Sequence, residues 1–365
     1  MSISSLRTSV ALTRCSHVAA ASVTGPGRFE LLDRVSTREL LIHDSEILPS
    51  LFLDADGTIQ ADIEICRSSE ALLVLAEGMT PDHLVRFLAD HRPPGIAAEI
   101  GNLSDSRTIL ALNGPYAWEL LSQLAGPGIL GQPYLTFFSD DRWTCLRSGK
   151  TGEVGYSLML PSERAAEVTD RILDLGARFD ITCVEVDELD GGYLENGALC
   201  MRARGITAYN PIELQQQWRV SYGKEFVGAS ALRARRQGDG SEQHRRSVYL
   251  ASAAELVPDS RVFCHQDEVG RILQTAYSAV RRQWVASAMV ERRFAYPGLT
   301  VLHVDGPDSR ADVTTITAPM INNRSLYVNP RLHSYFTRDE VEFPPLDMDA
   351  SWLVSGRQAG VEDGD

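Results

Sequence analysis

The sequence predicts an α+β protein of two or three domains, the last of them built mainly of β-strands. Its 365 residues exceed what one hydrophobic core normally organises. Apolar residues recur with both helical and strand-like spacing as far as residue 236, and with strand-like spacing beyond it. The pattern changes at a polar, glycine-rich run that we interpret as a domain boundary, Gln237-Gly238-Asp239-Gly240-Ser241-Glu242.

Helices and strands are mixed before this boundary. A short strand at 19–23 precedes a Gly-Pro-Gly turn and an amphipathic helix, because Phe29, Leu32 and Val35 fall at helical spacing. Two apolar segments joined by Asp54-Ala55-Asp56-Gly57 predict a β-hairpin. The remaining patterns predict strands at 71–76, 108–112, 134–138 and 143–147, and helices at 81–91, 116–124, 162–175 and 229–236.

Only short strands are predicted after the boundary. They lie at 247–251, 269–277, 284–290 and 300–304, separated by turn sequences such as Tyr296-Pro297-Gly298. This part is expected to form a small all-β domain. The acidic, polar tail at 358–365 is expected to be disordered.

The charge and composition of the chain indicate which kinds of binding partner are disfavoured. The formal net charge of −14 argues against nucleic acid and against an anionic membrane surface. No apolar stretch approaches the roughly 20 residues that cross a bilayer, and the first residues lack a secretory signal, so we expect a cytoplasmic protein. The six cysteines form no C-x-x-C pair and the eight histidines do not cluster, which predicts reduced, mostly buried thiols and no metal site.

Seven short motifs occur in a fixed order between about residues 16 and 302. They are V-T-G-P at 23–26, L-D-A-D-G-T-I-Q-A-D at 53–62, A-L-N-G-P at 111–115, S-G-K-T-G-E-V-G-Y at 148–156, N-P-I-E at 210–213, K-E-F-V-G at 224–228 and E-V-G-R-I at 268–272. In order and spacing they resemble the motifs of the glycine-cleavage T-protein (aminomethyltransferase) folate-binding family. Each motif alone is weak, and their shared order makes the resemblance specific.

The resemblance implies a three-domain cloverleaf with tetrahydrofolate at a central opening. The first domain would be discontinuous, covering 1–47 and 141–240, with a second domain at 48–140 and a β-rich, barrel-like domain at 241–357. Typical members carry a further segment ahead of the position of Arg14, so the chain is expected to be a variant with a shortened N-terminus.

Asp62 is the expected catalytic residue. It matches the second aspartate of the family's D-D pair, and a carboxylate there would stabilise an iminium-like carbon or relay a proton. The first aspartate of the pair is Ala61 here. Strand alternation places Gln60, Asp62 and Glu64 on one face, so the alternative is an outward-facing surface aspartate.

Five further residues are expected to bind the cofactor. Glu195 or Glu213 would accept hydrogen bonds from the pterin edge, and each could equally be a surface glutamate. Arg245 and Arg246 would pair with the glutamate carboxylates of folate, or else form a solvated basic cluster. Tyr156 would stack on an aromatic ring, although a strand tyrosine is more often part of the core.

Several departures from the family pattern concern the substrate. Lys150 replaces the tyrosine of T-G-Y-T-G, and Met201 falls near the tyrosine of L-Y-G, so both are expected to contact substrate. Val154 and Ser157 replace acids. These changes argue against a lipoyl carrier protein as partner and favour a small-molecule substrate; the oligomeric state is left open.

Three functions are therefore compatible with the sequence. The first is tetrahydrofolate-dependent transfer of a methyl or aminomethyl group, or demethylation, on a specialised small metabolite. The second is acid–base or cyclisation chemistry in a repurposed pocket without folate. The third is a folate-binding regulatory module without catalysis, which the Ala61 substitution motivates.

Overall fold

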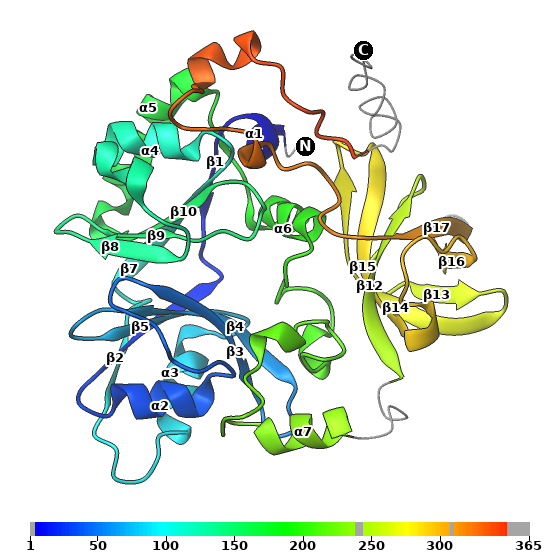
Figure 1. Cartoon of the computed structure of the whole chain (residues 1–365), viewed down its shortest axis with the longest axis horizontal. Coiled ribbons are helices and arrows are strands. Elements are labelled where there is room, and N and C mark those ends of the chain that lie inside the picture. Colours follow the sequence, from blue (N-terminus) through cyan, green and yellow to red (C-terminus); the bar gives the residue numbers. More distant parts are fainter. Residues whose placement is uncertain (1–3, 238–243, 307–309, 349–365) are drawn as a thin grey trace, which may run out of the picture.

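The computed structural model describes residues 4–237, 244–306 and 310–348. Two mixed α/β units and one β-barrel surround a central segment that contains helix α6 (Figure 1). The fold class is as predicted: helices and sheets are mixed before residue 237, and the C-terminal strands close into a barrel.

The first unit is a five-stranded antiparallel sheet with the order β3-β4-β5-β2-β6. Its strands are β2 (Val18–Thr24), β3 (Ile47–Leu53), β4 (Ile59–Arg67), β5 (Leu72–Glu77) and β6 (Glu99–Asn102). Helices α2 (Arg28–Val35) and α3 (Pro81–Asp90) cover one face, burying Leu32 and Leu88 against Ala61 and Ile63 (Figure 1). Thr80 caps α3, because its hydroxyl accepts a hydrogen bond from the backbone N–H of His83 at 3.3 Å.

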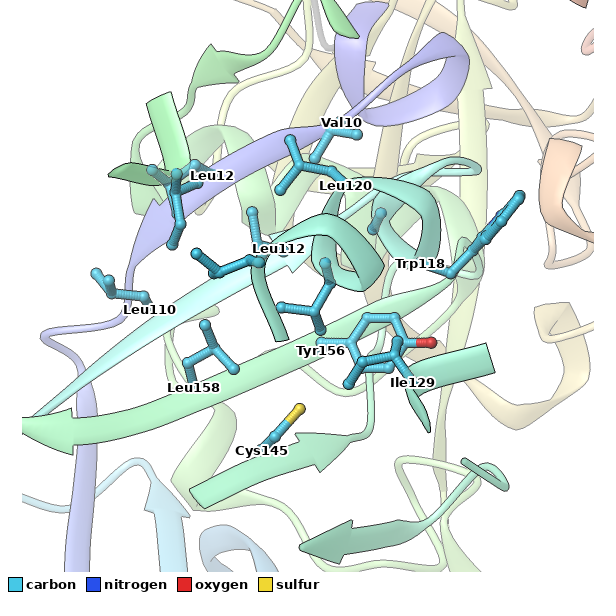
Figure 2. Close-up of a cluster of buried hydrophobic side chains, with 14 of the residues drawn as sticks. Val10, Leu12, Leu110, Leu112, Trp118, Leu120, Ile129, Cys145, Tyr156 and Leu158 are labelled. Atoms are coloured by element: carbon cyan, nitrogen blue, oxygen red, sulfur yellow. The ribbon is translucent and has the colours of Figure 1, made fainter. Parts of the chain in front are cut away.

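The second unit is a six-stranded sheet with the order β11-β1-β7-β10-β9-β8. Its strands are β1 (Ala11–Arg14), β7 (Arg107–Asn113), β8 (Thr136–Ser139), β9 (Thr144–Arg147), β10 (Gly155–Pro161) and β11 (Thr182–Cys183). Helices α4 (Ala117–Ala125) and α5 (Ala165–Gly176) pack on its outer face, where Leu112, Leu120, Tyr156 and Leu158 form the core (Figure 2). Gly114 begins the turn into α4 with φ +139°, and a Cβ there would lie 2.3 Å from the carbonyl oxygen of Ser9.

The inner faces of the two sheets pack against each other. Ala20 and Leu75 of the first sheet meet Ile109 and Met159 of the second in one buried cluster. Tyr193 of α6 (Val186–Asn196) belongs to the same cluster, so the helix inserts where the sheets meet. This arrangement turns one face of the β3–β4 hairpin toward the middle of the molecule.

The segment after α6 is largely irregular and packs on the hairpin. Residues between 199 and 232 bury their apolar side chains against Leu51, Leu53 and Ile59. Gly228 approaches the hairpin turn with φ +85°, and a Cβ there would lie 2.4 Å from the carbonyl oxygen of Asp54. Helix α7 (Ala229–Gln237) follows. Of the predicted boundary at 237–242, residues 238–242 lie outside the described ranges.

The third unit is a closed barrel with the strand order β12-β15-β14-β13-β16-β17. Its strands are β12 (Arg245–Ser252), β13 (Arg261–Cys264), β14 (Asp267–Ser278), β15 (Gln283–Glu291), β16 (Leu302–Asp305) and β17 (Arg310–Ile316). The chain then crosses back to the six-stranded sheet (Figure 1), where Tyr335 packs against Tyr116 and Phe179. The predicted tail at 358–365 lies outside the described residues.

The sheets divide the chain differently from the predicted domain limits. Strand β2 and helix α2, placed in the first domain, lie in the sheet of β3–β6, while β7 and β8, placed in the second, lie in the sheet of β1. Division along the sheets joins residues 4–14 to 107–196 and leaves 18–102 as the inserted unit. The chain leaves the six-stranded sheet after one four-residue strand, too short to show a period in the sequence.

Helices α1 (Ser4–Thr8) and α6 were not predicted as elements, nor were strands β1, β6, β10, β11, β13 and β17. Helix α6 carries Asp190, Gly191 and Gly192 in its middle, which weakens its apolar pattern.

Candidate active site

A cavity of about 730 Å³ lies between the three units. Both sheets, the central segment and the barrel contribute to its wall. The wall includes Arg38, Asp62, Glu64, Tyr134, Lys150, Asn196, Trp218, Arg219, Ser247 and Tyr249. This volume and this mixture of aromatic and charged groups are typical of a small-molecule site.

Asp62 lies on the inner wall of this cavity. Along β4, Ala61, Ile63 and Ile65 face the helices, so Asp62 and Glu64 face the opposite way. That face meets the cavity and the six-stranded sheet rather than solvent, and Asp62 is only 4% exposed. The surface-aspartate alternative therefore does not apply.

Two cations bind the Asp62 carboxylate. Lys150 Nζ lies 2.8 Å from Asp62 Oδ2 and 2.7 Å from Glu77 Oε1. Arg219 forms an ion pair with Asp62 Oδ1 and donates to the carbonyl oxygen of Ser50 at 2.7 Å. The carboxylate is thus held by one side chain from the loop between β9 and β10 and one from the central segment.

The electrostatic environment keeps Asp62 ionised. Burial alone would raise its pKa, but the charges of Arg219 and Lys150 and their hydrogen bonds outweigh burial and lower the pKa. Burial raises the pKa of Glu77, whose ion pair is with Lys150, the cation that also binds Asp62. Burial also raises the pKa of Glu64, which accepts a hydrogen bond from Ser148 at 3.0 Å. The inner wall therefore offers a fixed negative charge beside two carboxyl groups that hold protons more readily.

Aromatic and basic groups lie toward the opening. Trp218 and Tyr134 are 68% and 61% exposed although both line the cavity. Arg38 is half-buried and donates one long hydrogen bond, 3.4 Å to the carbonyl oxygen of Pro49. The cavity thus combines an acidic inner end with an aromatic, basic outer end.

The other predicted cofactor contacts near the opening lie beside the cavity rather than in its wall. Arg245 and Arg246 begin β12 and immediately precede Ser247 of the wall. Glu213 accepts hydrogen bonds from the backbone N–H and Nδ2 of Asn210, at 3.0 and 2.6 Å. Glu213 thus stabilises its own turn, next to the wall residue Leu214.

Three predicted site residues lie elsewhere. Glu195 is 1% exposed, pairs with Arg7 at 2.8 Å and accepts from Ser278 Oγ at 2.5 Å, so both carboxylate oxygens are used inside the protein. Tyr156 belongs to the core under α4 (Figure 2). Met201 is buried in the apolar cluster of the central segment. None of the three lies in the wall of the cavity, where they were expected, and their side chains pair or pack inside the protein.

Most wall residues were not predicted as site residues, among them Arg38, Tyr134, Trp218 and Arg219. Glu77, which binds Lys150 from behind the wall, was not predicted either. The sequence did contain a signal for Glu77, an acidic residue at the end of the otherwise apolar strand Leu72–Glu77. In the structure its side chain is buried, at 7% exposure. The others lie in irregular segments or beside turns, where no periodicity predicts which way a side chain points.

The structure also gives the state of the cysteines and bears on metal-binding groups and membrane-spanning helices. All six cysteines are free, four of them buried, with Cys183 exposed and Cys264 half-buried. Within 4–237, 244–306 and 310–348, no group of three or more His, Cys, Asp or Glu side chains could hold a metal ion. None of the helices described in those ranges has the length and apolar character to cross a membrane.

Comparison with known proteins gives a consistent result. The sequence model of a family described as the GCVT N-terminal domain matches residues 2–224, more than half of the chain and including the part ahead of Arg14. The aminomethyltransferase of Thermotoga maritima is 26% identical over 300 residues, 80% of each chain. The probable aminomethyltransferase of Aeropyrum pernix is 25% identical over 330 residues, 84% of this chain and 85% of the relative.

The fold has a solved counterpart. The glycine cleavage system aminomethyltransferase T from Bartonella henselae superposes with a TM-score of 0.76 at 21% identity, over 87% of this chain and 88% of that chain. The family match, the similar relatives and this shared fold agree: the chain belongs to the GCVT N-terminal domain family.

Proposed function

We propose that this protein is a tetrahydrofolate-dependent transferase that moves a one-carbon unit to or from a small metabolite. The observation that carries the proposal is the ionised Asp62 carboxylate, buried in the inner wall of a cavity large enough for a ligand of this size. Membership of a family whose similar members are named aminomethyltransferases supports the same reaction class.

The cavity has the groups that folate requires. A pterin needs an enclosed polar end, which Asp62 and Glu64 supply, and the aromatic middle of folate needs flat apolar surfaces, which Trp218 and Tyr134 supply. The glutamate carboxylates need cations, for which Arg38 in the wall and Arg245 and Arg246 beside it are the candidates.

Bound tetrahydrofolate would supply the nitrogen that carries the one-carbon unit. Asp62 would stabilise positive charge that develops on the transferred carbon, because its low pKa keeps it ionised and its burial keeps water from screening the charge. Lys150 and Arg219 hold the carboxylate in place, so no reorganisation is needed as charge develops.

We further propose that the partner substrate is a free small molecule rather than a group carried on a lipoyl protein. The support is the replacement of the family's tyrosine by Lys150, which extends into the wall and neutralises part of the acidic inner end. An assay with free donors and with a lipoyl-bound aminomethyl donor, each with tetrahydrofolate, distinguishes the two. Turnover with the lipoyl donor alone would contradict this part of the proposal.

Lys150 also motivates a second candidate function. Lys150 forms ion pairs with both Asp62 and Glu77, so these carboxylates are less available to folate. The pocket could then act on another small molecule without folate. The two functions differ in one requirement: the second predicts turnover with no folate present.

Calorimetry with tetrahydrofolate tests the first function. We expect wild type to bind at micromolar concentration or tighter. Asp62→Asn keeps the size and a hydrogen-bonding oxygen of the side chain but removes its charge, so binding should stay within a few-fold while single-turnover transfer falls by about 10²-fold or more. The matched control is Asp56→Asn, on the exposed turn of the same hairpin, which should behave as wild type in both measurements. Absence of tetrahydrofolate binding by wild type would refute the proposal.

A further inference from the structure

A second, smaller cavity lies behind Asp62 and Lys150. Its volume is about 60 Å³, and it shares Asp62, Glu64, Gly149 and Lys150 with the wall of the main cavity. Its remaining wall includes Cys15, Glu77, Asn113, Ser148, Ser157 and Tyr193. We call it the inner chamber. By its size it accommodates a few water-sized groups and no ring.

Glu77, which lines this chamber, has one carboxyl oxygen without a hydrogen-bond partner among the residues that the structure describes. Oε1 accepts from Lys150 Nζ at 2.7 Å, while Oε2 is buried and has no hydrogen-bond partner in the described part of the chain. Leaving a carboxyl oxygen buried without a hydrogen-bond partner is unfavourable. The chamber is therefore incomplete without a group that donates hydrogen bonds.

The local charge favours a cationic donor. Three carboxyl groups, Asp62, Glu64 and Glu77, line the chamber. Two cations oppose them, Lys150 in the wall and Arg219 through its ion pair with Asp62. The next cation, Arg202, is neutralised by Asp190, to whose Oδ2 its Nε donates at 2.8 Å. A cation bound beside Glu77 would favour the ionised form of this carboxyl group, and with all three carboxyls ionised one negative charge is left over for that cation to balance.

We propose that the inner chamber binds a small protonated amine, such as ammonium or methylammonium, with Glu77 Oε2 as its principal acceptor. Its N–H groups have further acceptors in the hydroxyls of Ser148 and Ser157. The volume sets the size limit, so an amine with four methyl groups is excluded.

The chamber's position suggests what the amine is for. It adjoins Asp62 on the side away from Trp218 and the opening, so an amine in it lies beside the expected site of transfer. The assignment of this amine as the amino group of the one-carbon donor or product rests on the proposed function. The binding itself does not.

Thermal unfolding of the full chain without folate tests the proposal. Ammonium chloride and methylammonium chloride should raise the Tm of wild type with a concentration dependence that follows mass action. Potassium chloride and tetramethylammonium chloride at the same ionic strength should raise it less. An equal rise with potassium would identify a general monovalent cation effect and overturn the proposal, as would no rise with either amine.

Two variants locate the effect. In Glu77→Gln the amine-dependent rise in Tm, measured from the variant's own baseline, should disappear. In the control Glu70→Gln, which removes the same charge from an exposed position, it should remain. Persistence of the full rise in Glu77→Gln would contradict the proposal.

Ser157→Val provides an independent test if Glu77→Gln does not fold. It reduces the chamber's volume without changing a charge, so calorimetry should detect weaker methylammonium binding; unchanged affinity would overturn the proposal. Tetrahydrofolate calorimetry on the same samples separates the two ideas. Amine binding without folate binding would refute only the proposed function, and folate binding without amine binding would refute only the chamber.

Discussion

Lys150 places one ammonium group between two buried carboxylates, 2.8 Å from Asp62 Oδ2 and 2.7 Å from Glu77 Oε1. Burial would lower its pKa, but Asp62 and Glu77 outweigh burial and raise it, so the group stays charged. Lys150 is therefore a positioning cation and not a nucleophile, since an amine nucleophile needs its neutral form.

Removing this cation should destabilise the protein. Lys150→Met leaves Glu77 without a counter-charge, and we expect the free energy of unfolding in urea to fall by about 3 kcal/mol, the scale of a broken buried ion pair. The double variant Lys150→Met/Glu77→Gln should recover part of that loss, because it removes the unpaired charge as well. Simple additivity of the two changes would show that the pair is not coupled.

The His17 side chain should make the free energy of unfolding depend on pH. It lies between β1 and β2, both ring nitrogens are buried without a partner in the described chain, and burial lowers its pKa to about 4. An unfolded histidine binds its proton near pH 6.5. Between pH 6.5 and 4 the unfolded chain therefore holds a proton that the folded chain lacks, and stability falls as pH falls through this window.

The His17 contribution can be isolated by substitution. The slope is at most about 1.4 kcal/mol per pH unit, and smaller because the residue as a whole is only half-buried. Urea unfolding of His17→Leu should show a flatter profile between pH 6.5 and 4, whereas His83→Gln, on the exposed side of α3, should follow wild type. Parallel profiles for His17→Leu and wild type would be inconsistent with a buried, neutral His17.

At the scale of elements, α6 connects three parts of the molecule. Its Glu195 pairs with Arg7 of α1 at 2.8 Å and accepts from Ser278 of the barrel strand β14 at 2.5 Å. Arg7 also lies 3.6 Å from Glu153, which accepts from the backbone N–H of Ser325 at 2.8 Å. This network places the barrel and the N-terminal helix around the cavity without entering it.

Glu195→Gln tests whether this role is structural. We expect the free energy of unfolding to fall by about 3 kcal/mol, because Arg7 loses its principal buried partner. Tetrahydrofolate affinity of the folded protein should stay within a few-fold of wild type. Glu213→Gln, whose carboxylate accepts hydrogen bonds from Asn210 of its own turn and is half-buried, should cost less stability. Weak folate binding by fully folded Glu195→Gln would restore the cofactor role first predicted for this residue.

The β3–β4 hairpin shows how far sequence reasoning reaches at this scale. Alternation correctly placed Asp62 and Glu64 opposite Ala61 and Ile63. It could not tell solvent from cavity, because that depends on the second sheet and the barrel, which meet the hairpin only after folding. Lys150 was predicted from the family pattern, but its contact with Glu77, 73 residues away, has no local signal.

At the scale of the whole molecule, the segment after β17 closes the structure. It leaves the barrel and returns to the outer face of the six-stranded sheet (Figure 1). There Tyr335 is buried, with its ring centroid 5.4 Å from those of Tyr116 and Phe179. This return path was not predicted, because its 3-10 turns and extended stretches carry no regular apolar period.

Tyr335→Ala should weaken the packing of this segment on the six-stranded sheet. Removal of a large buried aromatic side chain is expected to lower the free energy of unfolding by about 3–5 kcal/mol. Phe336→Ala, which removes a neighbouring ring that is nearly half-exposed, should cost less. Urea unfolding compares the two, and equal losses would mean that Tyr335 does not anchor the segment.

The arrangement of three units around one cavity is the basis of the functional account, and a crystal structure with tetrahydrofolate at saturating concentration tests it most directly. We predict a pterin ring in the main cavity beside Asp62, with the rest of the ligand passing Trp218 toward the opening. A ligand bound on the outer surface, or a main cavity without ligand at that concentration, would contradict the account.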